Sequence, residues 1–248
     1  GFVEIVLTGI HTAGYGQDFE DYSFYDLLVD LTTQVKGLKR LRISSIEMSQ
    51  ITHEIIDLIA TSPVIVDHLH IPIQSGCDKI LKKMNRHYTT DEFAQKLQEL
   101  KEKLPTLSIT TDVIVGFPGE TDAQFEDTLS LYEYCEYDLA YTFIYSPRAG
   151  TPAAKMEDDI DIHTKEQRLY RLNDLVNEKA LKQNQKYLNE VVEVLVEGTS
   201  KRDDQMLTGY TKHQKLINFK GNPQHIGQIV PVRVTEVKTW ALKGEEIE

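Results

Sequence analysis

Polar side chains suited to binding a small molecule follow five apolar segments in the first part of the chain. They are Thr8 and Gly9, Ser44 to Glu47, Gln74 and Ser75, Asp112 with Gly116, and Tyr145 to Arg148. Together they offer hydroxyl, amide and carboxylate groups, without a Ser-His-Asp order, a Walker-type lysine loop or a His/carboxylate metal triad. The set favours a polar small-molecule ligand and identifies no catalytic residue. Any single member is also explained as a cap on a neighbouring helix, so the interpretation depends on the set.

The stretch from Asp112 to Glu120 joins an apolar run to a glycine-rich turn and a helix start. Residues 113–115 are β-branched, which is typical of a strand covered on both faces. Pro118 favours an extended residue before it, and Thr121 with Gln124 forms a capping box. A strand therefore delivers its C-terminal end to a tight loop beneath a helix, where parallel α/β folds bind ligands. The alternative is an ordinary turn without a ligand.

Asp112 has two interpretations, because the register of its strand decides whether it points inward to a ligand or outward to a helix. His68 and His70 alternate along one predicted strand and resemble a metal-binding pair. No third ligand is in reach by sequence, so the pattern favours core or hydrogen-bonded histidines.

The elements that position these groups alternate between strands and helices. Apolar runs predict strands at residues 2–7, 40–45, 68–76 with its loop, 113–115 and 139–145. Helical spacing and capping boxes predict helices at 22–36, 52–60, 78–86, from 89 onward, and 122–134. Five strand–helix units in series argue for an α/β fold with parallel strands, either in a barrel or in an open doubly wound sheet.

The pattern changes in the last third of the chain. Residues 161–188 predict one long, highly charged helix. After it, strand periodicity marks residues 191–196, 207–210, 216–219, 229–237 and 239–242, with glycines between them. Five short strands in about sixty residues suit a small closed β-barrel of OB-like type. We therefore divide the chain into residues 1–155, a connecting helix at 156–188, and a β-barrel at 189–248.

Composition is that of a soluble globular protein, with 40% hydrophobic and 27% charged residues. No apolar run has the length of a membrane span and no signal peptide is recognised, so we expect a cytoplasmic protein without a membrane partner. The two cysteines, Cys77 and Cys135, lie far apart without CxxC spacing. They predict neither a disulfide framework nor a metal site built from this chain.

Charge is distributed unevenly between the two parts of the chain. Residues 1–186 carry 19 basic and 30 acidic residues, whereas residues 187–248 carry 8 and 9, which together give the net charge of −12. The nearly neutral last segment interleaves basic with aromatic residues, a combination with which small barrels hold RNA by phosphate attraction and base stacking. A plain interdomain spacer is the alternative. The residues are Lys201, Arg202, Lys212, His213, Lys215 and Lys220 with Tyr210, Phe219 and Trp240.

The motifs, taken in order, resemble the tRNA methylthiotransferases of the radical S-adenosylmethionine superfamily. They are LTGIHTAGYG, RLRISSIE, HLHIPIQSGCDKILKKMNRHYT, DVIVGFPGET, YTFIYSPRAGTPAAKM, VVEVLVEG and a barrel with GYT and INFKG. The resemblance implies a partial radical-SAM barrel, a C-terminal TRAM domain that binds tRNA, and methylthiolation at C2 of a modified adenosine beside the anticodon. It also implies S-adenosylmethionine as cofactor and two 4Fe–4S clusters, one for its cleavage and one associated with sulfur delivery.

Two departures from the family pattern qualify this expectation. The family's three N-terminal cysteines and its CxxxCxxC loop do not occur in the chain, which begins at what resembles the second barrel strand. We therefore expect a fragment that by itself holds neither cluster and is inactive, or alternatively a non-catalytic tRNA-binding remnant. The part up to Gly119 resembles enzymes acting on threonylcarbamoyl-adenosine, and the part from Thr121 resembles those acting on isopentenyl-adenosine. A hybrid gene explains both, and the second part, which includes the TRAM domain, favours isopentenyl-adenosine.

The resemblance also assigns roles to residues. For S-adenosylmethionine it implies Thr8 and Gly9 near the methionine moiety, Ser44, Glu47 and Gln74 near its polar groups, the Val115–Gly116–Phe117 loop near the adenine, and Asp112 as a further contact. For the tRNA anticodon stem-loop, the basic and aromatic residues of the barrel themselves predict contacts by Lys201, Arg202, Tyr210, Lys212, Lys215, Lys220 and Trp240. We expect no metal ligand in this chain and no DNA partner.

Overall fold

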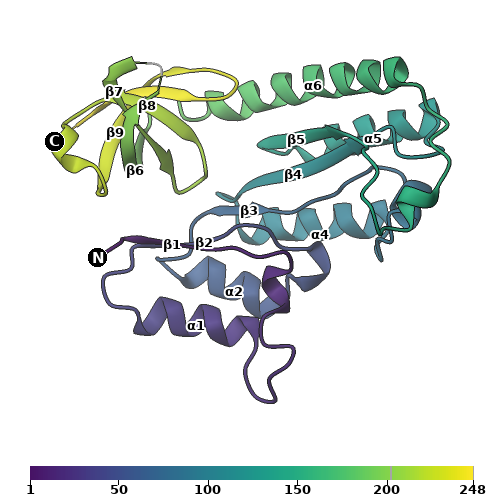
Figure 1. The fold of residues 1–248 in the computed structure, drawn as a ribbon. Helices are drawn as coiled ribbons and strands as arrows, with labels where there is room; N and C mark the ends of the chain where they lie inside the picture. The colour runs from purple at the N-terminus through teal and green to yellow at the C-terminus, as the bar shows by residue number, and fades with distance from the viewer. Residues whose placement is uncertain (202, 248) are drawn as a thin grey trace.

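A computed structural model describes residues 1–201 and 203–247, and it divides into an α/β region and a C-terminal barrel (Figure 1). The α/β region contains parallel strands β1 (Glu4–Leu7), β2 (Arg40–Ile43), β3 (His68–His70), β4 (Ser108–Val115) and β5 (Leu139–Ile144). Its helices are α1 (Phe24–Gln34), α2 (His53–Thr61), α3 (Asp78–Lys83), α4 (Thr90–Lys103) and α5 (Asp122–Cys135). Helix α6 (Ile162–Gln185) runs along the region and ends at the barrel.

The five parallel strands follow one another in chain order. Strand β1 pairs with β2, and β3 pairs with β4, which pairs with β5. The segment before β3 joins the two groups, because Leu41 N–H donates to Val64 O at 2.8 Å and Val66 N–H donates to Leu41 O at 3.1 Å. Helices pack in sequence, α1 on α2, α2 on α4, α4 on α5 and α5 on α6. The helices form one outer layer, whereas a doubly wound sheet has helices on both faces. The fold is therefore a partial barrel.

Local sequence signals explain where the helices begin. The predicted capping boxes at Thr89 and Thr121 are both formed with their partners three residues on, Glu92 and Gln124. Each box satisfies two backbone N–H groups that the first turn leaves unpaired.

The predicted start of the fourth strand at residue 113 is wrong, because β4 begins at Ser108. Its first half is polar but buried, so hydropathy did not reveal it.

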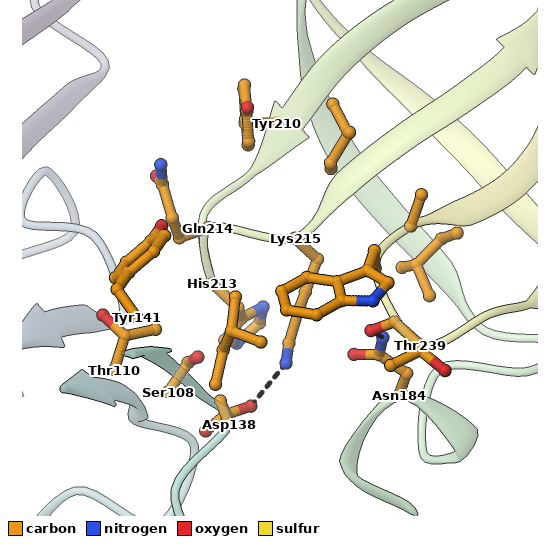
Figure 2. A pocket seen from close by; sticks show the side chains of 15 residues that line it. Ser108, Thr110, Asp138, Tyr141, Asn184, Tyr210, His213, Gln214, Lys215 and Thr239 are labelled. Carbon is orange, nitrogen blue, oxygen red and sulfur yellow. Dashed lines mark hydrogen bonds and ion pairs between the residues drawn. The ribbon is translucent and has the colours of Figure 1, made fainter. Parts of the chain in front are cut away.

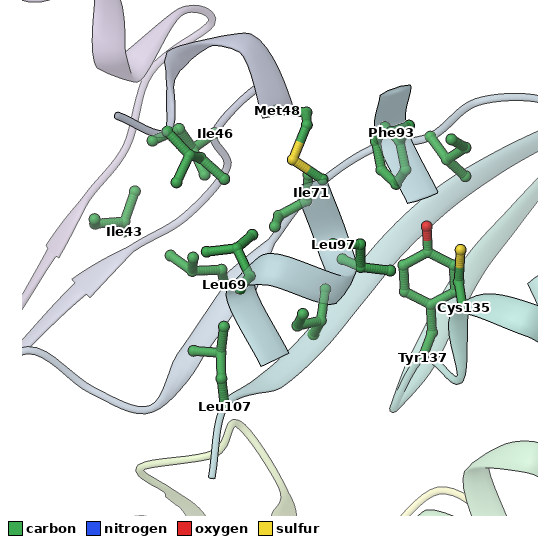
Figure 3. Close-up of a cluster of buried hydrophobic side chains, with 14 of the residues drawn as sticks. Ile43, Ile46, Met48, Leu69, Ile71, Phe93, Leu97, Leu107, Cys135 and Tyr137 are labelled. Carbon is green, nitrogen blue, oxygen red and sulfur yellow. The ribbon is translucent and has the colours of Figure 1, made fainter. Parts of the chain in front are cut away.

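The hydrophobic core lies between the outer face of the sheet and the helices (Figure 3). Leu69 from β3, Phe93 and Leu97 from α4, and Tyr137 after α5 contribute side chains that are buried almost completely. Val113 and Val115 belong to the same core with no exposed surface. Because side chains alternate along a strand, Asp112 and Ile114, on either side of Val113, face the concave side of the sheet.

The C-terminal barrel is closed, with strand order β10-β8-β7-β6-β9. It contains β6 (Val191–Ser200), β7 (Asp203–Thr211), β8 (Leu216–Lys220), β9 (Ile229–Val237) and β10 (Leu242–Glu246). Its own small core includes Phe219, which is fully buried, so the prediction that Phe219 offers a stacking surface is wrong. In the described part of the chain no helix is long and apolar enough to cross a membrane.

The predicted last strand at residues 239–242 is also wrong. Residues 239–241 form a turn in which Lys238 N–H donates to Ala241 O at 2.9 Å, and the strand starts at Leu242. Asn184 at the end of α6 holds this turn, because its amide nitrogen donates to Lys238 O at 2.8 Å and Thr239 O at 3.0 Å. The alternating apolar pattern around Trp240 therefore marks a turn fixed by a distant side chain.

Candidate ligand site and interdomain interface

The loops after β1 and β2 bring their predicted groups to the C-terminal end of the sheet. Thr8 and Gly9 are exposed directly after β1. Ser44 is half-buried, and its N–H donates to Leu7 O at 3.0 Å, which continues the pairing of the two strands. Glu47 is exposed and forms an ion pair with Arg86 at 2.7 Å. These positions are accessible to a ligand at this end of the sheet.

Gln74 is held in place by its backbone rather than by its side chain. Its N–H donates to Asp112 O at 2.9 Å, and its carbonyl accepts the Ile114 N–H at 2.9 Å. It adopts φ of +69°, a left-handed conformation that costs free energy in a residue with a side chain. The loop after β3 is thereby fixed beside β4, and Gln74 itself is buried.

Residues at the end of β4 differ in which way they face. The Val115 side chain lies in the core, so only its backbone is at the strand end. Ile114, its neighbour, is half-buried on the concave side. Phe117 is buried against Tyr145, with ring centroids 4.9 Å apart, in a small cluster with Cys77. In the loop to which the sequence assigned the adenine, the Val115 side chain is turned away from the concave side, and the adenine role stays a prediction.

Asp112 lies on the concave face in a polar chain with the two strand histidines. His70 Nε2 is 3.3 Å from Asp112 Oδ2, and its Nδ1 is 2.9 Å from Thr110 Oγ1. His68 Nε2 is 3.0 Å from the same Thr110 oxygen. The prediction of hydrogen-bonded histidines is confirmed. Within residues 1–201 and 203–247, no group of three His, Cys, Asp or Glu residues is suited to a metal ion.

A buried clamp that sequence analysis did not find holds the loop after β4. Glu120 Oε2 accepts the Gly116 N–H at 2.8 Å and the Arg168 Nη1 at 3.0 Å. The other Arg168 nitrogen, Nη2, contacts Asp122 Oδ1 at 2.7 Å. Burial raises the pKa of Glu120, against the opposing effects of the Gly116 N–H and Arg168. Arg168 sits on α6, 48 residues away, so no local signal marks the pair.

Lys165, one turn before Arg168, covers the same loop. Its ammonium pairs with Asp158 at 2.6 Å, and its aliphatic stem lies over Gly116. A Cβ added at Gly116 would lie 2.5 Å from Lys165 Cγ, and the residue has φ of +70°. Glycine is therefore required at this position on both steric and conformational grounds.

At the opposite, N-terminal end of the sheet, acids of the α/β region pair with lysines of the barrel. Lys212 Nζ is 2.7 Å from Asp67 Oδ2. Lys215 Nζ is 2.7 Å from Asp138 Oδ1, and Figure 2 shows this second pair as a dashed line. Hydrogen bonding from His213, and then from Lys212, lowers the pKa of Asp67 despite its partial burial. Lys212 and Lys215 therefore connect the two parts of the molecule, although the sequence suggested both as RNA contacts.

Two buried arginines complete this interface. Arg40 Nη1 donates to Tyr210 O at 3.0 Å, and its Nη2 donates to Glu193 O at 2.9 Å. Arg42 donates to Thr211 O at 3.3 Å. Burial lowers the pKa of Arg40. Because each guanidinium has several fixed donors, the pair binds the carbonyl groups of the barrel without needing acids there.

The other predicted RNA contacts come from separate loops of the barrel. Lys201 is exposed between β6 and β7, and Lys220 is exposed at the end of β8, 3.7 Å from Glu245. Trp240 has 57% of its surface exposed, and Tyr210 is half-buried. Arg202 lies outside the described residues.

Comparison with known families supports the two-part organisation. A family model described as the radical SAM superfamily matches residues 1–132, more than half of the chain. The chain belongs to the radical SAM superfamily. A model of the TRAM domain matches residues 185–247 of this radical SAM chain. The predicted fold class is confirmed, and the boundaries predicted at residues 155 and 188 stay predictions.

Curated relatives match the whole of this radical SAM chain. A tRNA-2-methylthio-N(6)-dimethylallyladenosine synthase from Anoxybacillus flavithermus is 47% identical over 250 residues, covering 100% of this chain and 47% of the relative. The protein of the same name from Bacillus subtilis is 47% identical over 249 residues, covering 100% of this chain and 48% of the relative. The chain thus spans about half the length of the curated relatives it matches.

One solved structure supports the fold alone. Coproporphyrinogen III oxidase from Escherichia coli, a radical SAM enzyme, aligns with a TM-score of 0.50 at 13% identity. The alignment covers 85% of this radical SAM chain and 51% of that protein.

The superfamily implies S-adenosylmethionine and an iron–sulfur cluster, which the residues fit unequally. Cys77 is buried beside Phe117, and Cys135 lies in the main core, where burial raises its pKa to about 11. Clusters bind thiolates, so these cysteines do not fit one. The concave face does fit S-adenosylmethionine, which carries a positive charge and an aromatic base. Asp112 offers a carboxylate there, and the half-exposed ring of Phe143 lies on the same face.

Proposed function

We propose that this chain is the S-adenosylmethionine-binding and tRNA-binding portion of an enzyme that methylthiolates C2 of isopentenyl-adenosine beside the tRNA anticodon. The single observation that carries the proposal is the 47% identity, along the whole chain, to proteins named for 2-methylthio-dimethylallyladenosine synthesis. Because dimethylallyl is another name for that isopentenyl group, both names favour isopentenyl-adenosine over threonylcarbamoyl-adenosine. A hybrid origin of the two sequence portions stays a prediction.

S-adenosylmethionine is assigned to the C-terminal end of the sheet. There we assign Thr8 and Gly9, which are exposed, to its methionine part, and Ser44, Glu47 and Gln74 to its polar groups. The Asp112 carboxylate suits the positive charge of the cofactor, and the backbone of Val115, Gly116 and Phe117 suits the adenine edge. When bound, this cofactor would supply radical chemistry. The residues of this chain bind and orient it, and we assign cluster ligation to none of them.

tRNA is assigned to the C-terminal barrel. Lys201 and Lys220 supply positive charge for phosphate groups, and Tyr210 and Trp240 supply aromatic surface for unpaired bases. Lys212 and Lys215 contribute indirectly, because their ion pairs with Asp67 and Asp138 fix the barrel on the α/β region. Arg202 remains a proposed contact from the sequence.

Salt dependence of binding tests the RNA part of the proposal. We expect an anticodon stem-loop to bind the full chain more weakly as salt rises. In the variant Lys201→Gln with Lys220→Gln, the slope of log K against log salt should fall by about 1 for each lysine that binds a phosphate group. Lys182→Gln on α6, an exposed lysine 4.0 Å from Glu136, is the matched control and should leave the slope unchanged. Absent or salt-independent binding would contradict the proposal.

A second candidate is a tRNA-binding protein without catalysis. The observation that favours it is the burial of both cysteines away from any shared site. Equilibrium binding of S-adenosylmethionine separates the two candidates. If the chain is part of the enzyme, it should bind S-adenosylmethionine, and Asp112→Asn should weaken that binding about tenfold, because the variant removes a carboxylate that faces the positive charge of the cofactor. If the chain is a tRNA-binding protein without catalysis, it should bind RNA and have no measurable affinity for S-adenosylmethionine.

A further inference from the structure

A cavity of about 200 Å³ lies where the α/β region meets the C-terminal barrel (Figure 2). Ser108 and Tyr141 line it from β4 and β5, Asn184 lines it from the end of α6, and Gln214 and Trp240 line it from two turns of the barrel. Pockets for drug-sized ligands measure about 300–1,000 Å³, so this cavity suits a single ring system. It lies toward the N-terminal end of the strands and reaches Asp112, because Tyr141, which lines the cavity, is the register partner of Asp112.

Aromatic side chains form much of the cavity wall. Tyr141 is 47% exposed and Trp240 is 57% exposed, and Tyr210 contributes a third, half-buried ring. Figure 2 shows Tyr141 beside Gln214 on one side, with Asn184 and Thr239 across from them. Exposed rings converging on one cavity are unusual for positions that serve folding alone, and they offer π-faces to a flat ligand.

Buried polar atoms in the wall lack partners. The amide nitrogen of Asn184 donates to two carbonyl oxygens, which only accept, so the orientation of the amide is fixed with Oδ1 as the free atom. Asn184 is 4% exposed and Ser108 is 2% exposed. Among the described residues, Asn184 Oδ1, Ser108 Oγ and Gln214 Oε1 have no hydrogen-bond partner. Each of the three atoms has almost no accessible surface, so the wall contains polar groups that are unpaired but covered by their neighbours.

The charges in the wall are already neutralised. Lys215 is paired with Asp138 at 2.7 Å, and His213 Nε2 is 3.5 Å from Asp67 Oδ2. Of the described lining residues, none is therefore a cation without an acidic partner. A phosphate group needs such a cation, whereas a neutral heterocycle does not. The cavity is matched to a base rather than to the backbone of a nucleic acid.

We propose that this interdomain cavity binds one unpaired nucleobase, stacked on the aromatic wall. The proposal rests on the proposed tRNA-binding function for the source of the base, an unstacked nucleotide of the bound RNA. A free nucleoside offers the same chemistry, and the experiment separates the two sources. The cavity is a recognition site that borders Asp112 on the side away from the loops after the strands.

Trp240 is the only tryptophan in the sequence, so its fluorescence reports on the cavity directly. The full chain is titrated with a single-stranded RNA trinucleotide, with an abasic trinucleotide of equal charge, and with free adenosine. We expect quenching by the two ligands that carry bases and none by the abasic one.

Tyr141→Ala should weaken the affinity measured by quenching about tenfold, a typical value for one stacking ring. Tyr141→Phe keeps the ring and should retain the affinity, which separates stacking from misfolding. Tyr170→Ala, which removes an exposed ring on α6, is the matched control.

Binding of a labelled anticodon stem-loop, followed in parallel by fluorescence anisotropy, separates this inference from the proposed function. If the stem-loop binds without quenching Trp240 and Tyr141→Ala has no effect, the cavity proposal is overturned and tRNA binding stands. If adenosine quenches Trp240 but the stem-loop does not bind, the cavity proposal stands for free nucleosides and tRNA binding is overturned. Equal quenching by the abasic trinucleotide also overturns the cavity proposal.

Discussion

At the C-terminal end of the parallel sheet, a buried ion pair within the α/β region fixes the loop after β4, whereas at the N-terminal end ion pairs join the sheet to another domain. Glu120 and Arg168 at the first end have side chains 1% and 7% exposed. Asp138 and Lys215 at the second are 14% and 9% exposed. The first pair lies behind the loop and leaves the strand-end groups free for a ligand. The second covers the strand ends with the barrel, so its lysine is not free to bind phosphate.

Breaking the pair at the C-terminal end should have the largest effect on stability. Arg168→Met leaves the Glu120 carboxylate buried without its guanidinium, which costs about 3–5 kcal/mol when a buried pair loses one partner. The free energy of unfolding, measured in urea by circular dichroism, checks this. Arg171→Met is the matched control, because Arg171 and Glu126 are 54% and 52% exposed and such pairs contribute about 0–1 kcal/mol. Equal losses in the two variants would refute the distinction.

Breaking a pair at the N-terminal end should have a smaller effect, directed at the attachment of the barrel. Lys215→Met leaves the Asp138 carboxylate with only the Ile109 N–H as a partner, which costs about 2 kcal/mol, the low end for a hydrogen-bonded interface pair. We expect faster proteolysis between α6 and β6, with the barrel itself still folded. Lys220→Met, which removes a lysine from an exposed pair with side chains 74% and 58% exposed, should change cleavage little. Cleavage at the wild-type rate in Lys215→Met would contradict this prediction and would show that Arg40 and Arg42 are enough to attach the barrel.

The N-terminal end should also be the more sensitive to acid. Burial first, and then Arg42, lowers the pKa of His68 well below its usual value, so the unfolded chain binds a proton below about pH 6.5 that the folded protein does not. Stability from His68 is therefore complete above that pH and falls below it, by about 1.4 kcal/mol between pH 7.5 and 5.5. Asp67 adds nothing in this window, because its lowered pKa affects stability only below about pH 4.

Urea unfolding of His68→Gln at the two pH values measures this contribution. The variant should lose about 1.4 kcal/mol less than the wild type on acidification. His87→Gln, at an exposed histidine, should keep the wild-type loss. An unchanged pH dependence in His68→Gln would assign the acid sensitivity to other groups.

Much of the fold follows from signals that act within a few residues. The capping boxes at Thr89 and Thr121 and the strand–helix alternation predicted the order of the elements, and the short strands with glycines predicted the closed barrel. The start of β4 at Ser108 was missed because its polar residues are buried by other parts of the chain. The turn at Trp240 was missed because Asn184, more than fifty residues earlier, holds it.

The candidate site was predicted in outline only, because side-chain direction and partners depend on packing. The strand ends were identified from the sequence, but the core contacts of Val115 and the concave position of Asp112 follow from the register of β4 against β5. The roles of the barrel lysines also depend on where packing places each side chain. A run of basic residues does not indicate whether a carboxylate of the same chain or a phosphate of a partner will meet it.

The sequence by itself determined the order of most helices and strands and the family to which the chain belongs, because periodicity, caps and motifs are local. Only the tertiary structure decided which charges are paired inside the molecule. Arg40 donates to a carbonyl 170 residues away, and Glu120 meets a guanidinium 48 residues away. Such pairs form when the chain brings distant groups together out of water, where an unpaired charge is costly, and that proximity is not encoded in any short stretch of residues.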